Sequence, residues 1–116
     1  MKKIDKINRN FKKYLINFNF KNTFYPTYTT QSLIQNSIKY VKKNQRTLDL
    51  GCGSGIISAC IHEKKLNQKF YLSDLSKKSV EVAKKNLFFM KKNCEFKNGD
   101  SFNPWKNYQF DLIIND

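Results

Sequence analysis

The sequence predicts an α/β fold in which parallel strands alternate with helices. Short apolar segments with strand character alternate with longer segments whose apolar residues recur every three or four positions. A glycine cluster directly follows the first of these short segments, as at a turn between a strand and a helix. With 116 residues, 40% of them apolar, the chain is long enough for one domain with a modest core.

The expected elements follow one another in a regular order. The first is an amphipathic helix over residues 4–20, because Ile7, Phe11 and Leu15 form an apolar stripe opposite basic residues. The others are, in order, a second helix capped by Thr29 or Thr30, a strand at 47–50, a helix containing Ile56 to Ile61, a strand at 70–72, a helix capped by Ser76, and strands at 94–97 and 110–114.

Right-handed crossovers place these four strands in the order 3-2-1-4 within one sheet. The strand at 110–114 then forms an uncovered apolar edge, which indicates that the chain holds only the N-terminal part of a larger fold. The expected organisation is a basic amphipathic helix at residues 1–23 and a ligand-binding domain at 24–116 that is incomplete at its C-terminus.

The net charge of +13, from 22 basic and 9 acidic residues, favours a polyanionic partner such as nucleic acid. Twenty of the basic residues are lysines, however, whereas specific readout of phosphates and bases favours arginine, and a genome-wide bias in composition would give the same charge. Cys52, Cys60 and Cys94 form no metal-binding pair, so we expect no metal site and reduced thiols in a cytoplasmic protein. No apolar run reaches the length of a transmembrane helix, and we expect no membrane partner.

The glycine cluster predicts a nucleotide-like ligand that lies against bare backbone. Gly51, Gly53 and Gly55 are three of the four glycines in the chain. A dinucleotide site requires G-x-G-x-x-G, and here Ile56 stands where its third glycine would be. Asp49, expected at the strand end facing the ligand, would repel a pyrophosphate but attract an ammonium or sulfonium group. S-adenosylmethionine carries both cations and no phosphate, so it is favoured over a dinucleotide of an oxidoreductase.

Two further aspartates follow the second and third predicted strands. Asp74 lies 23 residues after Gly51, where a carboxylate can accept hydrogen bonds from both hydroxyls of a ribose. Asp100 is placed to accept from the exocyclic amino group of an adenine, and Phe102 is close enough to cover the ring. Such aspartates are also common turn formers, and their value as a signal lies in their combination with the glycine cluster.

These motifs resemble the class I S-adenosylmethionine-dependent methyltransferases over residues 24–116. The resemblance implies the N-terminal part of a Rossmann-like fold and S-adenosyl-L-methionine as the cofactor. It implies the following cofactor-binding residues: Thr30, Asp49, Gly51, Cys52, Gly53, Gly55, Asp74, Leu75, Asp100, Ser101 and Phe102.

A narrower resemblance joins the chain to the release-factor glutamine methyltransferases and the methyltransferase small domain group. Pro26, Thr30 and Leu33 have the P-x-x-x-T-x-x-L spacing that is found upstream of the glycine motif in this group, although a helix cap after a proline turn has the same pattern. The group closes its fourth strand with N-P-P-Y, whereas here Asn115 and Asp116 follow the strand. These two residues are the expected catalytic residues, and Asp116 would accept a proton or hydrogen bond from an attacking nitrogen.

The sequence thus favours the cofactor-binding portion of a methyltransferase that modifies a macromolecule. The expected substrate is a protein glutamine amide, in a release factor or a ribosomal protein, or RNA, with further nucleic-acid contact through the lysine-rich surface. The alternatives are a non-catalytic nucleic-acid-binding module that uses the basic helix at residues 4–20, and an inactive methyltransferase fragment.

Overall fold

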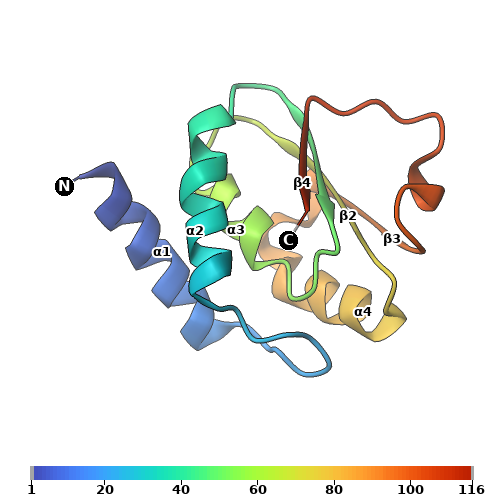
Figure 1. The fold of residues 1–116 in the computed structure, drawn as a ribbon, viewed down its shortest axis with the longest axis horizontal. Coiled ribbons are helices and arrows are strands. Elements are labelled where there is room, and N and C mark those ends of the chain that lie inside the picture. Colours follow the sequence, from blue (N-terminus) through green and yellow to red (C-terminus); the bar gives the residue numbers. More distant parts are fainter. Residues whose placement is uncertain (1, 116) are drawn as a thin grey trace.

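A single parallel sheet of four strands organises the computed structural model, which describes residues 2–115 (Figure 1). The strand order is β3-β2-β1-β4, which confirms the predicted order 3-2-1-4. The strands are β1 (Arg46–Leu50), β2 (Lys69–Asp74), β3 (Cys94–Asn98) and β4 (Leu112–Asn115).

Within the described residues, four α-helices and three short 3-10 helices precede or connect the strands. They are α1 (Lys3–Asn17), α2 (Tyr28–Ser37), η1 (Ile38–Tyr40), α3 (Ile56–His62), α4 (Lys77–Asn86), η2 (Phe88–Asn93) and η3 (Asn103–Trp105). None of the helices described in residues 2–115 is long and apolar enough to cross a membrane.

The sheet separates two cores because successive side chains of a strand point to opposite faces. On one face, Phe70 and Leu72 of β2 pack with apolar residues of all four α-helices in the larger core. On the other face, Tyr71 packs with Leu48, Leu50 and the buried Trp105. The indole Nε1 of Trp105 donates a hydrogen bond of 2.8 Å to Ser73 Oγ, which fixes the segment after β3 against this face.

The first helix is part of the larger core. Ile7, Phe11 and Tyr14 are its buried residues and pack with those of α2 and α3, while lysines face outward. The helix ends at Asn17, earlier than the predicted residue 20, because Phe18 takes an extended conformation (φ −84°, ψ 151°).

The structure corrects the predicted start of the second helix. Thr27, not Thr29 or Thr30, is the cap residue, and its backbone is extended (φ −112°, ψ −179°). Thr30 lies one turn into the helix, where its hydroxyl accepts a hydrogen bond of 3.2 Å from the Thr27 amide. The two threonines thereby form a capping box.

The last strand is shorter than predicted and begins at Leu112. Phe110 instead packs against the smaller core, with its ring edge-to-face to that of Tyr71 and 5.2 Å between the centroids. Asp111 accepts a hydrogen bond of 2.7 Å from the Arg46 amide, which starts the pairing of β4 with β1. Within residues 2–115, β4 has one neighbouring strand, and Ile113 on it is 49% exposed.

Candidate functional site

A cleft of about 730 Å³ lies at the carboxyl end of β1 and β2. The glycine turn forms one wall, and the loop before α2 forms the opposite wall. In open parallel sheets, ligands bind at this edge. The residues that line the cleft are Asn22, Thr23, Phe24, Tyr25, Pro26, Thr27, Thr29, Thr30, Gly51, Cys52, Gly53, Ser54, Ile56, Ile57, Asp74, Ser76 and Ser79.

The three glycines of the turn serve two different purposes. All three have a positive φ, of 72° at Gly51, 52° at Gly53 and 87° at Gly55. A Cβ added at Gly51 or Gly53 would meet nothing within 4 Å, so these two leave open space for a ligand beside the backbone. A Cβ at Gly55 would lie 2.8 Å from Leu87 Cδ1, so this glycine permits close packing against the segment after α4.

Backbone hydrogen bonds hold the turn against the end of β2. The amides of Gly51 and Cys52 both donate to the Ser73 carbonyl at 2.9 Å. The Gly53 amide donates to Asp74 Oδ2 at 2.9 Å, and the Ser76 amide donates to Asp74 Oδ1 at 2.9 Å. Because a carboxylate oxygen can accept two hydrogen bonds, Asp74 can hold these amides and also accept from hydroxyl groups of a ligand.

Asp49 does not occupy the open position at the strand end that the sequence led us to expect. Its carboxylate is 1% exposed, lies outside the cleft lining, and accepts a hydrogen bond of 2.7 Å from Ser58 Oγ in α3. The reason is strand parity, since Asp49 pairs with Leu72 and Ile114, whose side chains face the helices. A contribution of Asp49 to cofactor binding stays a prediction, and it would act through charge from beneath the turn.

The carboxylates of Asp49 and Asp74 make the turn electronegative. The pKa of the Cys52 thiol is raised well above its usual value, first by burial and then by repulsion from Asp49 and Asp74. Cys52 is therefore neutral at physiological pH and serves as a small buried side chain of the cleft wall. The same repulsion acts on a phosphate and becomes attraction for a cation.

The predicted adenine-side residues lie at the same sheet edge but outside the cleft lining. The loop after β3 is fixed beside Asp74, because the Gly99 amide donates to the Asp74 carbonyl at 3.1 Å and the Asn98 side chain donates to it at 2.9 Å. Leu75, which follows Asp74, and Phe102, which lies in the loop after β3, are 73% and 51% exposed. Asp100 and Ser101 are exposed as well.

Of the two predicted catalytic residues, the structure describes one. Asn115 is exposed at the end of β4, and its register partner in β1 is Leu50, which precedes the glycine turn. It therefore lies at the edge of the sheet that holds the cleft. Asp116 lies outside the described residues.

The sequence reasoning missed the loop that forms the outer wall of the cleft. Asn22 to Tyr25 line the cleft together with Ser76 and Ser79 of the α4 start. The Ser79 hydroxyl donates a hydrogen bond of 3.1 Å to the Asn22 carbonyl, which fixes the loop to α4. Phe24 projects from this loop and is 98% exposed. The aromatic pair before Pro26 is the available signal for this loop in the sequence.

Several proteins of known family are similar to this chain in sequence. The ribosomal protein L11 methyltransferase of Thermotoga neapolitana is 36% identical over 87 residues, which are 74% of this chain and 32% of that protein. The release factor glutamine methyltransferase of Buchnera aphidicola is 33% identical over 95 residues, 79% of this chain and 34% of that protein. This chain therefore spans about a third of the length of the curated relatives it matches.

The fold is also found in solved structures. A candidate RNA methyltransferase from Pyrococcus horikoshii superimposes with a TM-score of 0.77 at 19% identity, over 100% of this chain and 59% of that one. A Podospora anserina methyltransferase with bound S-adenosylhomocysteine superimposes with a TM-score of 0.64 at 18% identity, over 97% of this chain and 50% of that one. Identities this low establish the Rossmann-like fold alone.

A family model covers the part of the chain that builds the sheet and the cleft. Residues 28–116 match the model of the methyltransferase small domain, which agrees with the glycine turn and strand order described above. The chain therefore belongs to the methyltransferase small domain family.

Proposed function

We propose that this chain is the cofactor-binding part of an S-adenosylmethionine-dependent methyltransferase that modifies a macromolecule. The observation that carries the proposal is the charge of the cleft. In a chain with 22 basic residues, the cleft lining among the described residues contains no lysine or arginine, and its one charged side chain is Asp74. Such a cleft suits a cationic, phosphate-free adenosyl ligand and disfavours a dinucleotide.

The described residues fit this cofactor. Gly51 and Gly53 leave backbone uncovered beside the cleft, so a ligand can lie directly against the turn. Asp74 at the cleft wall is available to accept hydrogen bonds from ribose hydroxyls. Asp100 and Phe102, on the loop fixed beside Asp74, would contact the adenine side. Thr30, 7% exposed in the first turn of α2, completes the opposite wall.

When bound, S-adenosylmethionine supplies a methyl group on a positively charged sulfur. The transfer of this group is an in-line displacement, so the protein contributes mainly by aligning the acceptor atom and by excluding water. Asn115 at the tip of β4 would orient an acceptor nitrogen through its side-chain amide, and Asp116 would accept the proton that this nitrogen loses. The buried carboxylate of Asp49 would stabilise the cationic cofactor from beneath the turn.

The macromolecular substrate is proposed from the relatives. Their names record activity on ribosomal protein L11, on a release factor, and, in a Haemophilus influenzae relative 34% identical over 83 residues, on ribosomal RNA of the small subunit. For this chain we infer a substrate from the same set, a protein amide or RNA, in a cytoplasmic setting.

Isothermal titration calorimetry with S-adenosylmethionine and S-adenosylhomocysteine tests the proposal. We expect micromolar binding of both and no binding of NADH. Asp74→Asn removes the charge but keeps the shape of the side chain, and we expect it to weaken binding at least about tenfold, as for a lost hydrogen bond to a charged group. Glu81→Gln, an exposed acid on the outer face of α4, is the matched control and should bind normally. Absence of a heat signal for both adenosyl ligands with the folded chain contradicts the proposal.

A further inference from the structure

The outer face of α4 and η2 concentrates positive charge and exposed aromatic rings. Positions 77, 78, 81, 84 and 85 fall on one side of α4, opposite the buried Val80 and Ala83, and Phe88 and Phe89 of η2 are exposed after it. We call the exposed residues of 77–92 the lysine face. They are Lys77, Lys78, Lys84, Lys85, Lys91, Lys92, Glu81, Phe88 and Phe89.

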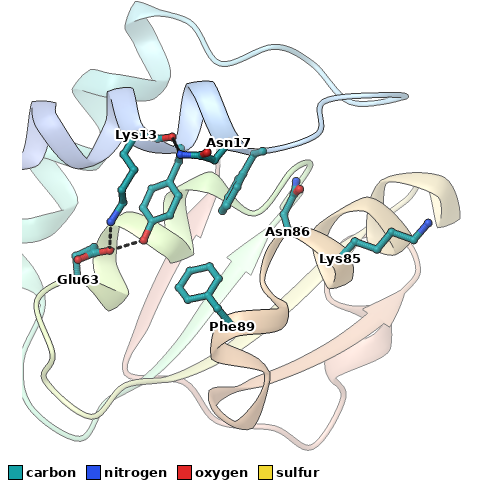
Figure 2. A pocket seen from close by; sticks show the side chains of 8 residues that line it. Lys13, Asn17, Glu63, Lys85, Asn86 and Phe89 are labelled. Carbon is teal, nitrogen blue, oxygen red and sulfur yellow. Dashed lines mark hydrogen bonds and ion pairs between the residues drawn. The ribbon is translucent and has the colours of Figure 1, made fainter.

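A hollow of about 410 Å³ borders the lysine face, between the C-terminal half of α1 and the α4–η2 segment (Figure 2). Phe89 and Lys85 contribute to it from the lysine face, Lys13 and Tyr14 contribute from α1, and Phe18 contributes from the residue after α1. The ring of Phe89 is 56% exposed. It lies nearly parallel to the ring of Tyr14, with centroids 6.0 Å apart and an interplanar angle of 16°.

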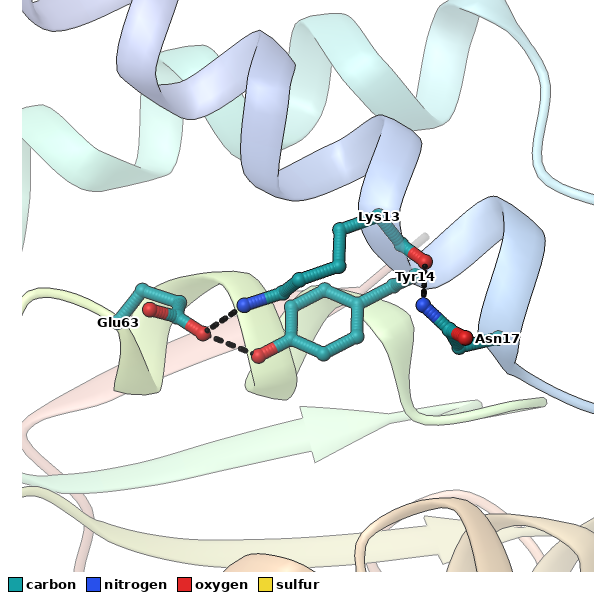
Figure 3. Close-up of polar contacts among 4 residues, drawn as sticks. All are labelled: Lys13, Tyr14, Asn17 and Glu63. Atoms are coloured by element: carbon teal, nitrogen blue, oxygen red, sulfur yellow. Dashed lines mark hydrogen bonds and ion pairs between the residues drawn. The ribbon is translucent and has the colours of Figure 1, made fainter.

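Among the described residues, Glu63 is the one acid that lines the hollow, and it is already paired. Glu63 Oε1 lies 2.8 Å from Lys13 Nζ and also accepts a short hydrogen bond from the Tyr14 hydroxyl (Figure 3). Burial alone would raise the pKa of Glu63, but these two hydrogen bonds and the charge of Lys13 lower it below its usual value. The charge of Glu63 is thus balanced by Lys13, and Lys85 leaves the rim of the hollow positive.

Aromatic rings interleaved with lysines are the composition of a surface that binds single-stranded nucleic acid. Bases stack on exposed rings, and lysines neutralise the phosphates between them. Here Lys91 Nζ lies 4.3 Å from the ring centroid of Phe88, so a positive charge lies directly beside an exposed ring. The lysine pairs 77/78 and 84/85 stand two helical turns apart, about 10 Å along the helix, and offer successive phosphate contacts.

We propose that the lysine face and the adjoining hollow bind single-stranded nucleic acid, with one base stacked on Phe89 at the mouth of the hollow. This surface is separate from the cofactor cleft, and the proposal does not depend on the cofactor. A bilayer is disfavoured, because the hollow is lined by the amides of Asn17 and Asn86 and by the Lys13–Glu63 ion pair, which are costly to transfer into an apolar environment.

Fluorescence anisotropy of the whole chain tests this proposal with labelled RNA and DNA strands of about 12 nucleotides, a length that covers one typical site. We expect binding to single strands of both kinds that weakens as KCl rises, and clearly weaker binding to a duplex of the same sequence, whose bases are already stacked. The double variant Lys84→Ala/Lys85→Ala should lower the slope of log affinity against log salt by about 1.4, at about 0.7 per lost phosphate contact. The control is Lys42→Ala/Lys43→Ala, which removes the same charge from two exposed lysines before β1 and should leave the affinity nearly unchanged.

The aromatic contribution needs its own pair of variants. Phe89→Ala should weaken single-strand binding about 5- to 100-fold, the range for one stacked base. Phe88→Ala, at a ring that is 65% exposed, gives a second test if Phe89→Ala does not fold. Tyr40→Ala, an aromatic residue 67% exposed on η1, is the matched control. The proposal is overturned if the two lysine pairs behave alike, if duplex binds as tightly as single strands, if neither phenylalanine affects affinity, or if only anionic phosphatidylserine vesicles bind.

Discussion

The different surroundings of the glycines lead to a prediction about Gly55 that can be worked out from distances. In Gly55→Ala, the new methyl group would sit at a φ of 87°, which costs an L-residue about 1–2 kcal/mol. It would also lie 2.8 Å from Leu87 Cδ1 and 3.0 Å from Leu87 Cγ. Leu87 is 0% exposed, so it cannot move aside into solvent, and overpacking of this kind costs about 1–3 kcal/mol.

We therefore expect Gly55→Ala to lower the free energy of unfolding by about 2–5 kcal/mol, a large share of the usual 5–15 kcal/mol. Gly51→Ala is the matched control, because φ is 72° there but nothing lies within 4 Å of the new Cβ. Its cost should be the strain alone, about 1–2 kcal/mol. Urea unfolding followed by fluorescence measures both, since Trp105 is the one tryptophan and is buried in the smaller core.

A double-mutant cycle isolates the contact with Leu87. In a Leu87→Ala background, the side chain that the new methyl group meets is shorter, so Gly55→Ala should cost only the backbone strain. The coupling free energy between the two positions should be about 1–3 kcal/mol. If Gly55→Ala and Gly51→Ala destabilise equally, or if the cycle shows no coupling, then close packing of the turn on the segment after α4 is not the reason for the third glycine.

Three further predictions concern the cleft and its supports. Gly51→Ala should weaken S-adenosylmethionine binding at least about tenfold in calorimetry, because the methyl group enters the open space beside the turn. Its cost in stability is smaller than that of Gly55→Ala. Unchanged affinity would show that no ligand lies in this space. Asn86→Ala removes hydrogen bonds of 3.0 Å to the Ser54 carbonyl and 2.8 Å to the Asn19 carbonyl, and one of 2.9 Å from the Asn19 amide. This variant should lower the free energy of unfolding in urea by about 2–4 kcal/mol and weaken cofactor binding. The control Asn93→Ala removes one hydrogen bond of 3.3 Å to the Gln68 carbonyl and should cost clearly less. For Glu63, whose folded pKa is below the reference value of 4.5, the stabilisation is present above pH 4.5 and is lost as the pH falls through the folded pKa. Glu63→Gln should therefore show a flatter decline of stability with acid than the parent chain, and parallel acid profiles would contradict this contribution.

The sheet and the glycine turn were predictable because their signals are local. The predicted cap Ser76 is confirmed, since its hydroxyl accepts a hydrogen bond of 3.2 Å from the Ser79 amide. The N-terminus of α2 was harder, because three threonines at 27, 29 and 30 all have the chemistry of a cap. The extended backbone at Thr27 decides between them.

Two features of the site differ in how far the sequence could predict them. The side-chain direction of Asp49 follows from strand parity, so the alternation with Leu48 and Leu50 already contained it. The loop wall of the cleft has no periodic pattern of its own. It is set by a hydrogen bond from Ser79 to the Asn22 carbonyl, across 57 residues of sequence, and no local rule identifies such a pair.

The distribution of charge would allow one small basic chain to bind the two proposed ligands of opposite sign. Positive charge is placed on the outer face of α4, where lysines remain hydrated and where salt screens their mutual repulsion. Negative charge is placed at Asp49, where burial leaves it less screened, and at Asp74, which accepts a hydrogen bond from the Gly53 amide. Asn86 lies between these regions, since it lines the hollow and donates to the Ser54 carbonyl of the glycine turn. A polyanion on the lysine face and a cation in the cleft therefore do not compete for the same side chains, and any communication between them has a short structural route through Asn86.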